Sequence, residues 1–198
     1  MAGEQAAGPT MTDEMLVQST LSGEKAAFRE LFDRYRAGAY RVAYRFVGNH
    51  EDAMDVAQEA FVKVHRSLAS FEQRSQFRTW LMRIVTNTAL DLRRSRGSSP
   101  TAPLSDEIVE TLGEESQPER RVETPVERME YGELREALKR ALERLSVAHR
   151  RVFVLHAEGE LTYREIAEIE KISEGTVMSR LYHARKNLQK ILSNAGVL

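Results

Sequence analysis

The sequence predicts an all-α protein made of two small helical domains that are joined by an acidic linker. Apolar residues recur every three or four positions over several long stretches, which is the period of a helix buried along one side. No alternating apolar and polar run of useful length indicates a β-strand. Four of the five prolines fall within residues 97–130, where apolar periodicity is absent. Helical patterns on both sides of such a stretch are typical of two domains with a linker between them.

Charge is distributed unevenly along the 198 residues. The net charge is −1, which by itself argues against a nucleic-acid-binding protein. Residues 24–96 and 132–198 nevertheless carry net charges of +5 and +3, whereas residues 1–23 and 97–131 carry −3 and −6. Two basic blocks are therefore separated by an acidic one, and the average conceals a pattern that favours nucleic-acid binding.

The composition also excludes several classes of protein. The chain has no cysteine, so it has neither a disulfide framework nor a thiolate metal site. No apolar run approaches the length of a membrane span, and the N-terminus lacks a signal pattern, so we expect a cytoplasmic protein without membrane insertion. The five histidines show no spacing that would assemble a metal site. We expect no cofactor and no enzymatic activity.

Residues 1–23 are expected to form a loose tail and a first helix. Met11 is followed by Thr12, Asp13 and Glu14, a run that resembles a translation start leading into a helix cap. Met11 is therefore a candidate alternative start, and the true start, Met1 or Met11, is left open.

Residues 24–96 form the first predicted domain, with three further helices. An apolar stripe runs from Phe28 to Phe46, and Gly48 ends that helix. Asn49 is a suitable cap for the next helix, whose buried face runs from residue 53 to residue 68.

The outward face of this second helix carries Asp55, Gln58, Glu59 and Val62. One exposed valine among carboxylates is common on a solvated surface. The same feature is also expected of a docking surface for a partner.

The third helix of this domain has the residues needed to hold unpaired bases. Phe71 begins a loop, and the helix starts near Phe77. Trp80, Arg83 and Asn87 lie at i, i+3 and i+7, so they form one ridge. An aromatic ring, a guanidinium and an amide in a row can stack on exposed bases and hydrogen-bond with them. The alternative is that Trp80, the only tryptophan, belongs to the core.

Three arginines end this third helix. Arg93, Arg94 and Arg96 lie where a cation is favourable to the helix dipole. The same side chains are candidates for contacts with DNA phosphates.

Residues 131–198 form the second predicted domain, and its last two helices have the layout of a helix-turn-helix. Thr162 and Glu165 form a capping-box pair, and Ser173 is a suitable cap for the final helix. One face of that helix is apolar from Val177 to Leu192, and the opposite face is basic and hydrogen-bonding. This is the arrangement that reads a DNA major groove, although short amphipathic helices with a basic face also occur in many helical bundles.

Three segments resemble, in this order, the two domains of bacterial sigma factors of the extracytoplasmic-function (ECF) group in the sigma-70 family. They are residues 28–68, 70–96 and 161–188. The resemblance includes the runs D-V-A-Q-E-A-F, F-R-T-W-L and E-G-T-V-M-S-R-L. It covers the chain from about residue 12 to residue 192 except for the linker.

The resemblance implies that the protein binds core RNA polymerase and directs it to promoter DNA. It divides the chain into a tail with a first helix, a polymerase-docking and minus-ten domain, an acidic linker, and a minus-thirty-five domain (1–23, 24–96, 97–130 and 131–198). The residues implied for polymerase docking are Asp55, Gln58, Glu59 and Val62. Those implied for the melted minus-ten element are Phe71, Phe77, Trp80, Arg83 and Asn87. Those implied for the minus-thirty-five element are Thr176, Met178, Ser179, Arg180, Tyr182, His183, Arg185 and Lys186.

Two positions depart from the family pattern. Met178 and His183 stand where many members carry a basic residue, so a particular promoter sequence is not carried over. The family often uses an anti-sigma factor, and such a partner is possible here. The alternatives are a conventional helix-turn-helix regulator with an N-terminal sensing domain, and an interaction module that has lost DNA binding.

Overall fold

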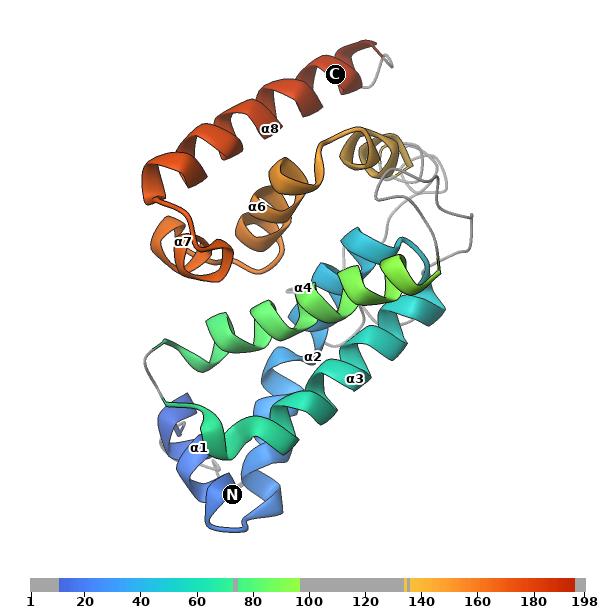
Figure 1. Ribbon diagram of the computed structural model, residues 1–198. Helices are drawn as coiled ribbons and strands as arrows, with labels where there is room; N and C mark the ends of the chain where they lie inside the picture. The colour runs from blue at the N-terminus through green and yellow to red at the C-terminus, as the bar shows by residue number, and fades with distance from the viewer. Residues whose placement is uncertain (1–10, 73–74, 97–133, 135, 195–198) are drawn as a thin grey trace, which may run out of the picture.

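The computed structural model describes residues 11–72, 75–96, 134 and 136–194. Every regular element in these ranges is a helix, so the predicted all-α fold is confirmed. Helices α1 to α4 form one group, and α6 to α8 form a second group that lies across α4 (Figure 1). The predicted linker at 97–130 and the first ten residues lie outside the described ranges.

The first group contains five helical elements. They are α1 (Asp13–Leu21), α2 (Lys25–Val47), α3 (His50–Ser67), a short 3-10 helix η1 (Leu68–Ser70) and α4 (Phe77–Ser95). Helices α2, α3 and α4 all contact one another, and α1 packs on α2. The sequence pattern predicted the four α-helices but not η1.

Local signals decide where α2 ends and α3 begins. Gly48 adopts a left-handed conformation with φ of 80°, which glycine tolerates without steric cost, and it terminates α2. The side chain of Asn49 then accepts a hydrogen bond from the backbone N–H of Asp52 at 2.9 Å. Both predictions are confirmed, and the short connection makes α2 and α3 antiparallel neighbours.

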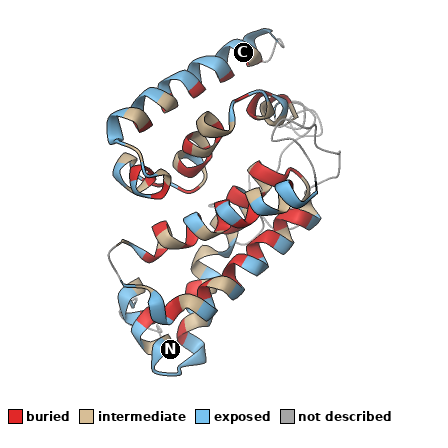
Figure 2. Ribbon diagram, in the orientation of Figure 1, coloured by how far each residue is buried: buried red, intermediate tan, exposed pale blue. Residues whose placement is uncertain are grey.

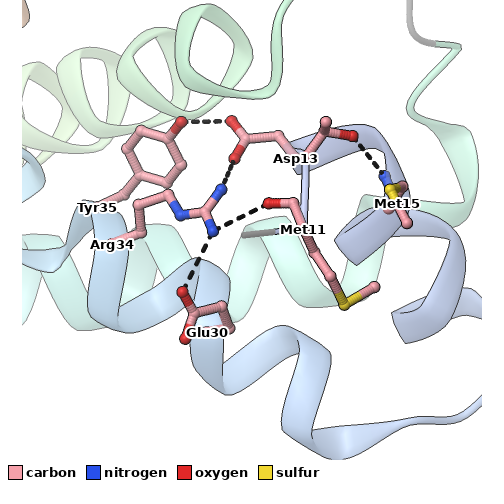
Figure 3. Close-up of polar contacts among 7 residues, drawn as sticks. Met11, Asp13, Met15, Glu30, Arg34 and Tyr35 are labelled. Atoms are coloured by element: carbon pink, nitrogen blue, oxygen red, sulfur yellow. Dashed lines mark hydrogen bonds and ion pairs between the residues drawn. The ribbon is translucent and has the colours of Figure 1, made fainter. Parts of the chain in front are cut away.

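Asp13 fixes α1 against α2 (Figure 3). Its carboxylate accepts one hydrogen bond from Arg34, at 2.6 Å, and another from the hydroxyl of Tyr35. Arg34 also donates to the backbone carbonyl of Met11 at 3.2 Å and pairs with Glu30. Burial raises the pKa of Tyr35, and Asp13 raises it further, so the phenol remains a donor at neutral pH.

The apolar stripes predicted from the sequence face the interior, where the buried residues of Figure 2 line the inner sides of the helices. The first core is built around Leu31, Phe46, Val56, Leu81 and Val85, each at most 1% exposed. These residues come from α2, α3 and α4, and the same core continues into the second group through Leu155, Ile166 and Leu181.

The second group consists of a helix over residues 136–143, α6 (Val147–Ala157), α7 (Tyr163–Glu170) and α8 (Glu174–Asn194). Ser146 caps α6, because its hydroxyl accepts from the backbone N–H of His149. The helix over 136–143 packs on the C-terminal half of α8 in a separate small core.

Two buried arginines close helix ends. Arg150 is 2% exposed and donates to the backbone carbonyls of Leu142 and Glu143 at 2.9 and 2.8 Å. Burial, reinforced by the charge of Arg93, lowers the pKa of Arg150 to about 10. Arg93 is 8% exposed and donates to the carbonyl of Phe46 at 3.0 Å. The prediction that Arg93 meets DNA phosphates is therefore wrong, because this side chain braces the end of α2.

Candidate nucleic-acid and partner interfaces

Helices α7 and α8 form a helix-turn-helix in which local hydrogen bonds set each boundary. The hydroxyl of Thr162 accepts from the backbone N–H of Glu165 at 3.3 Å, and the carboxylate of Glu165 accepts from that of Thr162 at 2.8 Å. Lys171 turns the chain in a left-handed conformation with φ of 54°. Ser173 then caps α8 by accepting from the backbone N–H of Thr176 at 3.1 Å. The predicted capping box and turn are confirmed.

The two faces of α8 are divided as the sequence predicted. The buried residues are Val177, Leu181, Ala184, Leu188 and Leu192. Met178 and Tyr182 are 56% and 62% exposed, although large, mainly apolar side chains of this kind are usually buried in a protein core. The predicted contacts Ser179, His183, Arg185 and Lys186 are also exposed, whereas Thr176 and Arg180 are half-buried. The outer face of α8 is therefore available to a partner.

His149 on α6 extends this face, and the sequence analysis did not identify it. Its ring lies 6.2 Å from that of His183, measured between ring centroids. Burial lowers the pKa of His149, and the neighbouring His183 and Arg180 lower it further. His149 and His183 are 34 positions apart, so only the packing of α6 against α8 brings them together.

Three of the predicted minus-ten residues, Phe71, Phe77 and Trp80, form an aromatic cluster at the start of α4. Phe71 stacks on Trp80 with ring centroids 4.8 Å apart and planes at 23°. Phe77 lies edge-on to both rings but is only 3% exposed, so it supports the cluster from the protein interior. Trp80 is half-buried, and Arg83 and Asn87 are exposed on the same helix. The alternative that Trp80 is a core residue is therefore only partly correct, since its ring packs on Phe71 but the residue is only half-buried.

The predicted docking residues Asp55, Gln58, Glu59 and Val62 are all exposed on α3. Val62 is 48% exposed. Glu59 pairs with Lys63 one turn later, at 2.7 Å. Asp55 and Val62 therefore present a mixed acidic and apolar surface to the solvent.

An apolar groove borders this surface and was not predicted. It has a volume of about 440 Å³ and is lined by Phe28, Phe32, Phe61 and His65 together with Gln58, Val62 and Arg66. Phe28 and Phe32 belong to the apolar stripe of α2, and the sequence pattern assigned them to the core. They are instead half-buried: Phe28 packs on His65 and Phe32 on Phe61 of α3, and both also line the open groove.

The two helical groups touch along a seam, which we define as the contacts of α2 and α4 with α6, α7 and the loop between α6 and α7. Arg45 pairs with Glu158 at 2.7 Å, and Arg41 approaches the same carboxylate at 3.5 Å. The sequence predicted two domains and gave no indication that they contact each other.

Glu165 takes part in both the helix-turn-helix and the seam. Besides closing the capping box, it accepts a hydrogen bond from Thr79 of α4 at 2.5 Å. Burial alone would raise the pKa of Glu165, but hydrogen bonds from Thr162 and Thr79 outweigh burial, and the net pKa is lowered. The carboxylate is therefore ionised at neutral pH.

Within the described part of the chain, no three side chains of His, Asp or Glu gather as a metal site would require. None of the described helices is both long enough and apolar enough to pass through a membrane.

Two family models match the chain. The model of sigma-70 region 2 matches residues 31–99, and the model of sigma-70 region 4 matches residues 135–188. The first range contains α3, α4 and most of α2, and the second contains α6, α7 and α8 as far as Leu188.

Full-length relatives show the same similarity. The chain is 35% identical to the ECF RNA polymerase sigma-E factor of Escherichia coli K12 over 176 residues, which is 89% of this chain and 92% of that protein. It is 34% identical to the ECF RNA polymerase sigma factor SigW of Bacillus subtilis, covering 90% and 98% of the two chains.

Solved structures support the fold. The structure of CnrH in complex with the cytosolic domain of CnrY matches with a TM-score of 0.68 and 26% identity, over 92% of this chain and 97% of that one. The sigma factor RpoE of Bartonella quintana, solved with the anti-sigma factor NepR, matches with a TM-score of 0.63 and 23% identity, over 84% and 96%.

Proposed function

The chain belongs to the ECF group of the sigma-70 family, and we propose that three of its surfaces divide the work of a sigma factor between them. It binds core RNA polymerase and directs the enzyme to promoter DNA for transcription initiation. The observation that carries this conclusion is that region 2 and region 4 occur in order in one chain, within relatives covered over about nine tenths of their length. The comparisons do not favour a conventional regulator with a sensing domain.

The outer face of α8 is proposed to read the minus-thirty-five element in the major groove. Helix α7 supports it from behind, as the first helix of such a motif does. The exposed Ser179, Tyr182 and His183 are suited to base edges, and Arg185 and Lys186 to phosphates. Met178, in place of the basic residue of many members, offers an apolar contact such as a thymine methyl group accepts.

The start of α4 is proposed to capture bases of the melted minus-ten element. A flipped base loses a few kcal/mol of stacking, and a protein aromatic surface offsets this loss. The Phe71–Trp80 stack supplies that surface, and the exposed Arg83 and Asn87 supply hydrogen bonds beside it. Phe77 keeps the stack in place rather than contacting a base itself.

The exposed face of α3 is proposed to bind the clamp helices of the largest polymerase subunit. The half-exposed Val62 and the adjoining groove offer apolar surface, and the exposed Asp55 offers a negative charge two helical turns before Val62. A helix of the partner is a suitable occupant, because an amphipathic helix buries its apolar face in such a groove.

The remaining assignments follow from the same family membership. The first domain is proposed to span residues 24–96, the linker 97–130 and the second domain 131–198, after a tail and first helix over 1–23. The protein is proposed to act in the cytoplasm, and an anti-sigma factor is a possible regulator, as in the solved complex of RpoE with NepR. Synthesis of RNA belongs to the polymerase, so no catalytic group is required of this chain.

Asp55→Arg tests the docking assignment. We expect this variant to fold normally but to lose co-purification with core polymerase and run-off transcription, since a cation replaces an exposed carboxylate of the proposed docking face. Asp33→Arg is the matched control, because Asp33 is an exposed acid on α2 outside the groove. Normal co-purification of the Asp55→Arg variant would contradict the proposed docking surface.

A further inference from the structure

The loop between α6 and α7 is a short acidic clamp, defined here as Glu158, Gly159 and Glu160. Gly159 fits where a side chain would not, since a Cβ there would lie 2.6 Å from the backbone carbonyl oxygen of Leu155. Glu160 adopts a left-handed conformation with φ of 52°, which is unfavourable for a residue with a side chain. The chain thus accepts local strain in a loop that carries two carboxylates.

Both carboxylates of the acidic clamp bind arginines of the first domain. Glu158 engages Arg45 and Arg41, which lie one helical turn apart on α2. Glu160 pairs with Arg78 of α4 at 2.5 Å. The Arg45–Glu158 pair is the better shielded of these contacts, with side chains 25% and 18% exposed, so water screens it less than an ordinary surface pair.

The acidic clamp contacts the first turn of α4, the end of that helix that also carries Trp80. Arg78 directly precedes Thr79 and Trp80 on α4, and Thr79 is itself held by Glu165 of α7. Arg78 therefore lies in the same turn of α4 as Trp80, on a different side of the helix, and is occupied by a carboxylate of the same chain. A DNA phosphate offers an arginine the same charge and geometry as that carboxylate.

With the seam formed, the two proposed DNA-binding surfaces lie too close together to reach both promoter elements. The minus-ten and minus-thirty-five elements, named for their positions upstream of the transcription start, are separated by roughly 25 base pairs, or roughly 85 Å at 3.4 Å per base pair. Helix α7 touches α4 directly, and α4 with 19 residues is only about 28 Å long. Both elements therefore cannot be bound until the seam parts.

We propose that the acidic clamp is an intramolecular substitute for DNA phosphates, which occupies Arg41, Arg45 and Arg78 and holds the free chain in a closed form. This inference rests on the proposed function for its consequence, since opening of the seam releases the three arginines to the promoter backbone. It assigns Arg41, Arg45 and Arg78 as phosphate contacts in addition to the residues named above.

The test measures the distance between the two domains in the free protein. Because the chain has no cysteine, Asp91→Cys and Gln189→Cys introduce two unique labelling sites at exposed positions on α4 and α8. We expect high energy transfer between the two dyes in the parent protein and a clear fall in the Glu158→Gln/Glu160→Gln variant. Glu168→Gln is the matched control, since it removes an acid of α7 that pairs within its own helix.

The same variants are then titrated with a single-stranded minus-ten oligonucleotide. Loss of the acidic clamp is expected to raise affinity about three- to tenfold, because each partly exposed pair contributes modestly and must break first. The Glu168→Gln control is expected to change affinity less than twofold, which separates the clamp from a general effect of charge.

A charge exchange identifies the pair itself. Glu160→Arg is expected to open the seam and raise oligonucleotide affinity. The added Arg78→Glu is expected to restore energy transfer and to lower oligonucleotide affinity to that of the parent protein or below it. Unchanged energy transfer in the Glu158→Gln/Glu160→Gln variant would overturn the proposal, as would opening in the Glu168→Gln control. Energy transfer is read without DNA or polymerase, so failure of promoter binding in the parent protein would contradict the proposed function and not the closed form.

Discussion

Helices α4 and α8 are both proposed to bind promoter DNA, yet they present their residues in different ways. The outer face of α8 is open, with Met178 and Tyr182 more than half exposed. The N-terminal end of α4 is largely covered by other parts of the chain, since Trp80 is stacked on Phe71 and Thr79 donates a hydrogen bond to Glu165. The outer face of α8 is accessible to a partner, whereas the N-terminal end of α4 makes contacts within the chain.

This difference matches the forms of DNA that the two helices are proposed to bind. A duplex offers its base edges in the major groove without rearrangement, so exposed side chains on a rigid helix suffice. An unpaired base must first leave its stack, and it then needs a partly enclosed aromatic surface. An enclosed surface near the seam is also easier to keep unavailable until DNA is present.

Removal of one core side chain from each helix gives the largest expected effect. Leu81→Ala in α4 and Leu181→Ala in α8 remove leucines that are 0% and 1% exposed. Each is expected to lower the free energy of unfolding by about 2–5 kcal/mol, because the cavity left behind is not refilled. Chemical denaturation followed by domain-specific fluorescence would show two separable losses, and identical curves for the two variants would show that the seam makes the domains unfold as one.

Trp80→Ala is expected to separate the two DNA-binding modes. Loss of the indole removes about 1–3 kcal/mol of stacking with a base, so affinity for a single-stranded minus-ten oligonucleotide should fall by roughly 5- to 150-fold. Duplex minus-thirty-five fragments should bind as before, since Trp80 lies on α4. Trp80→Phe is the control and should retain part of the affinity; equal loss on both DNA forms would argue that Trp80 is a core residue only.

His183→Ala makes the reciprocal change on α8. We expect about 1 kcal/mol of weaker binding to promoter duplex, the size of one hydrogen bond, with polymerase binding unchanged. Fluorescence anisotropy on a promoter fragment measures the first quantity and co-purification the second. An unaltered duplex affinity would mean that α8 enters the groove in another orientation.

Glu165→Gln gives the smallest effect and depends on pH. The pKa of Glu165 is lowered in the folded protein, so its ionised form stabilises the fold above the unfolded value of 4.5, and this contribution is lost as the pH falls below that value. At pH 7 the variant is expected to be less stable by at most about 1 kcal/mol, since water screens a partly exposed carboxylate. The difference from the parent protein should shrink as the pH is lowered from 5 to 3, and a constant difference would contradict the assignment.

The helices were predictable because their signals are local. Thr162 with Glu165, and Asn49 with Asp52, act within one turn of the chain, and the buried face of α8 follows from a fixed spacing. The relation of the two domains was not predictable in this way. Arg45 and Glu158 are 113 positions apart, and neither residue has a local signature that names the other.

The candidate surfaces show the same division. Exposure of Val62 and of the α8 contacts followed from helical position alone. Phe28 and Phe32 were assigned to the core because periodicity cannot tell a covered apolar side chain from one at an open groove. The misplaced Arg93 has a similar cause, since a carbonyl 47 positions away accepts its hydrogen bond.

The surroundings of His149 couple DNA binding by α8 to protonation of this side chain. In the free protein, burial and the positive groups around it keep this imidazole neutral at neutral pH. A phosphate arriving at Arg180 and His183 would counter those positive charges and favour the imidazolium. Binding near pH 6.5 should therefore take up protons, and the heat of association measured by calorimetry should vary with the ionisation enthalpy of the buffer.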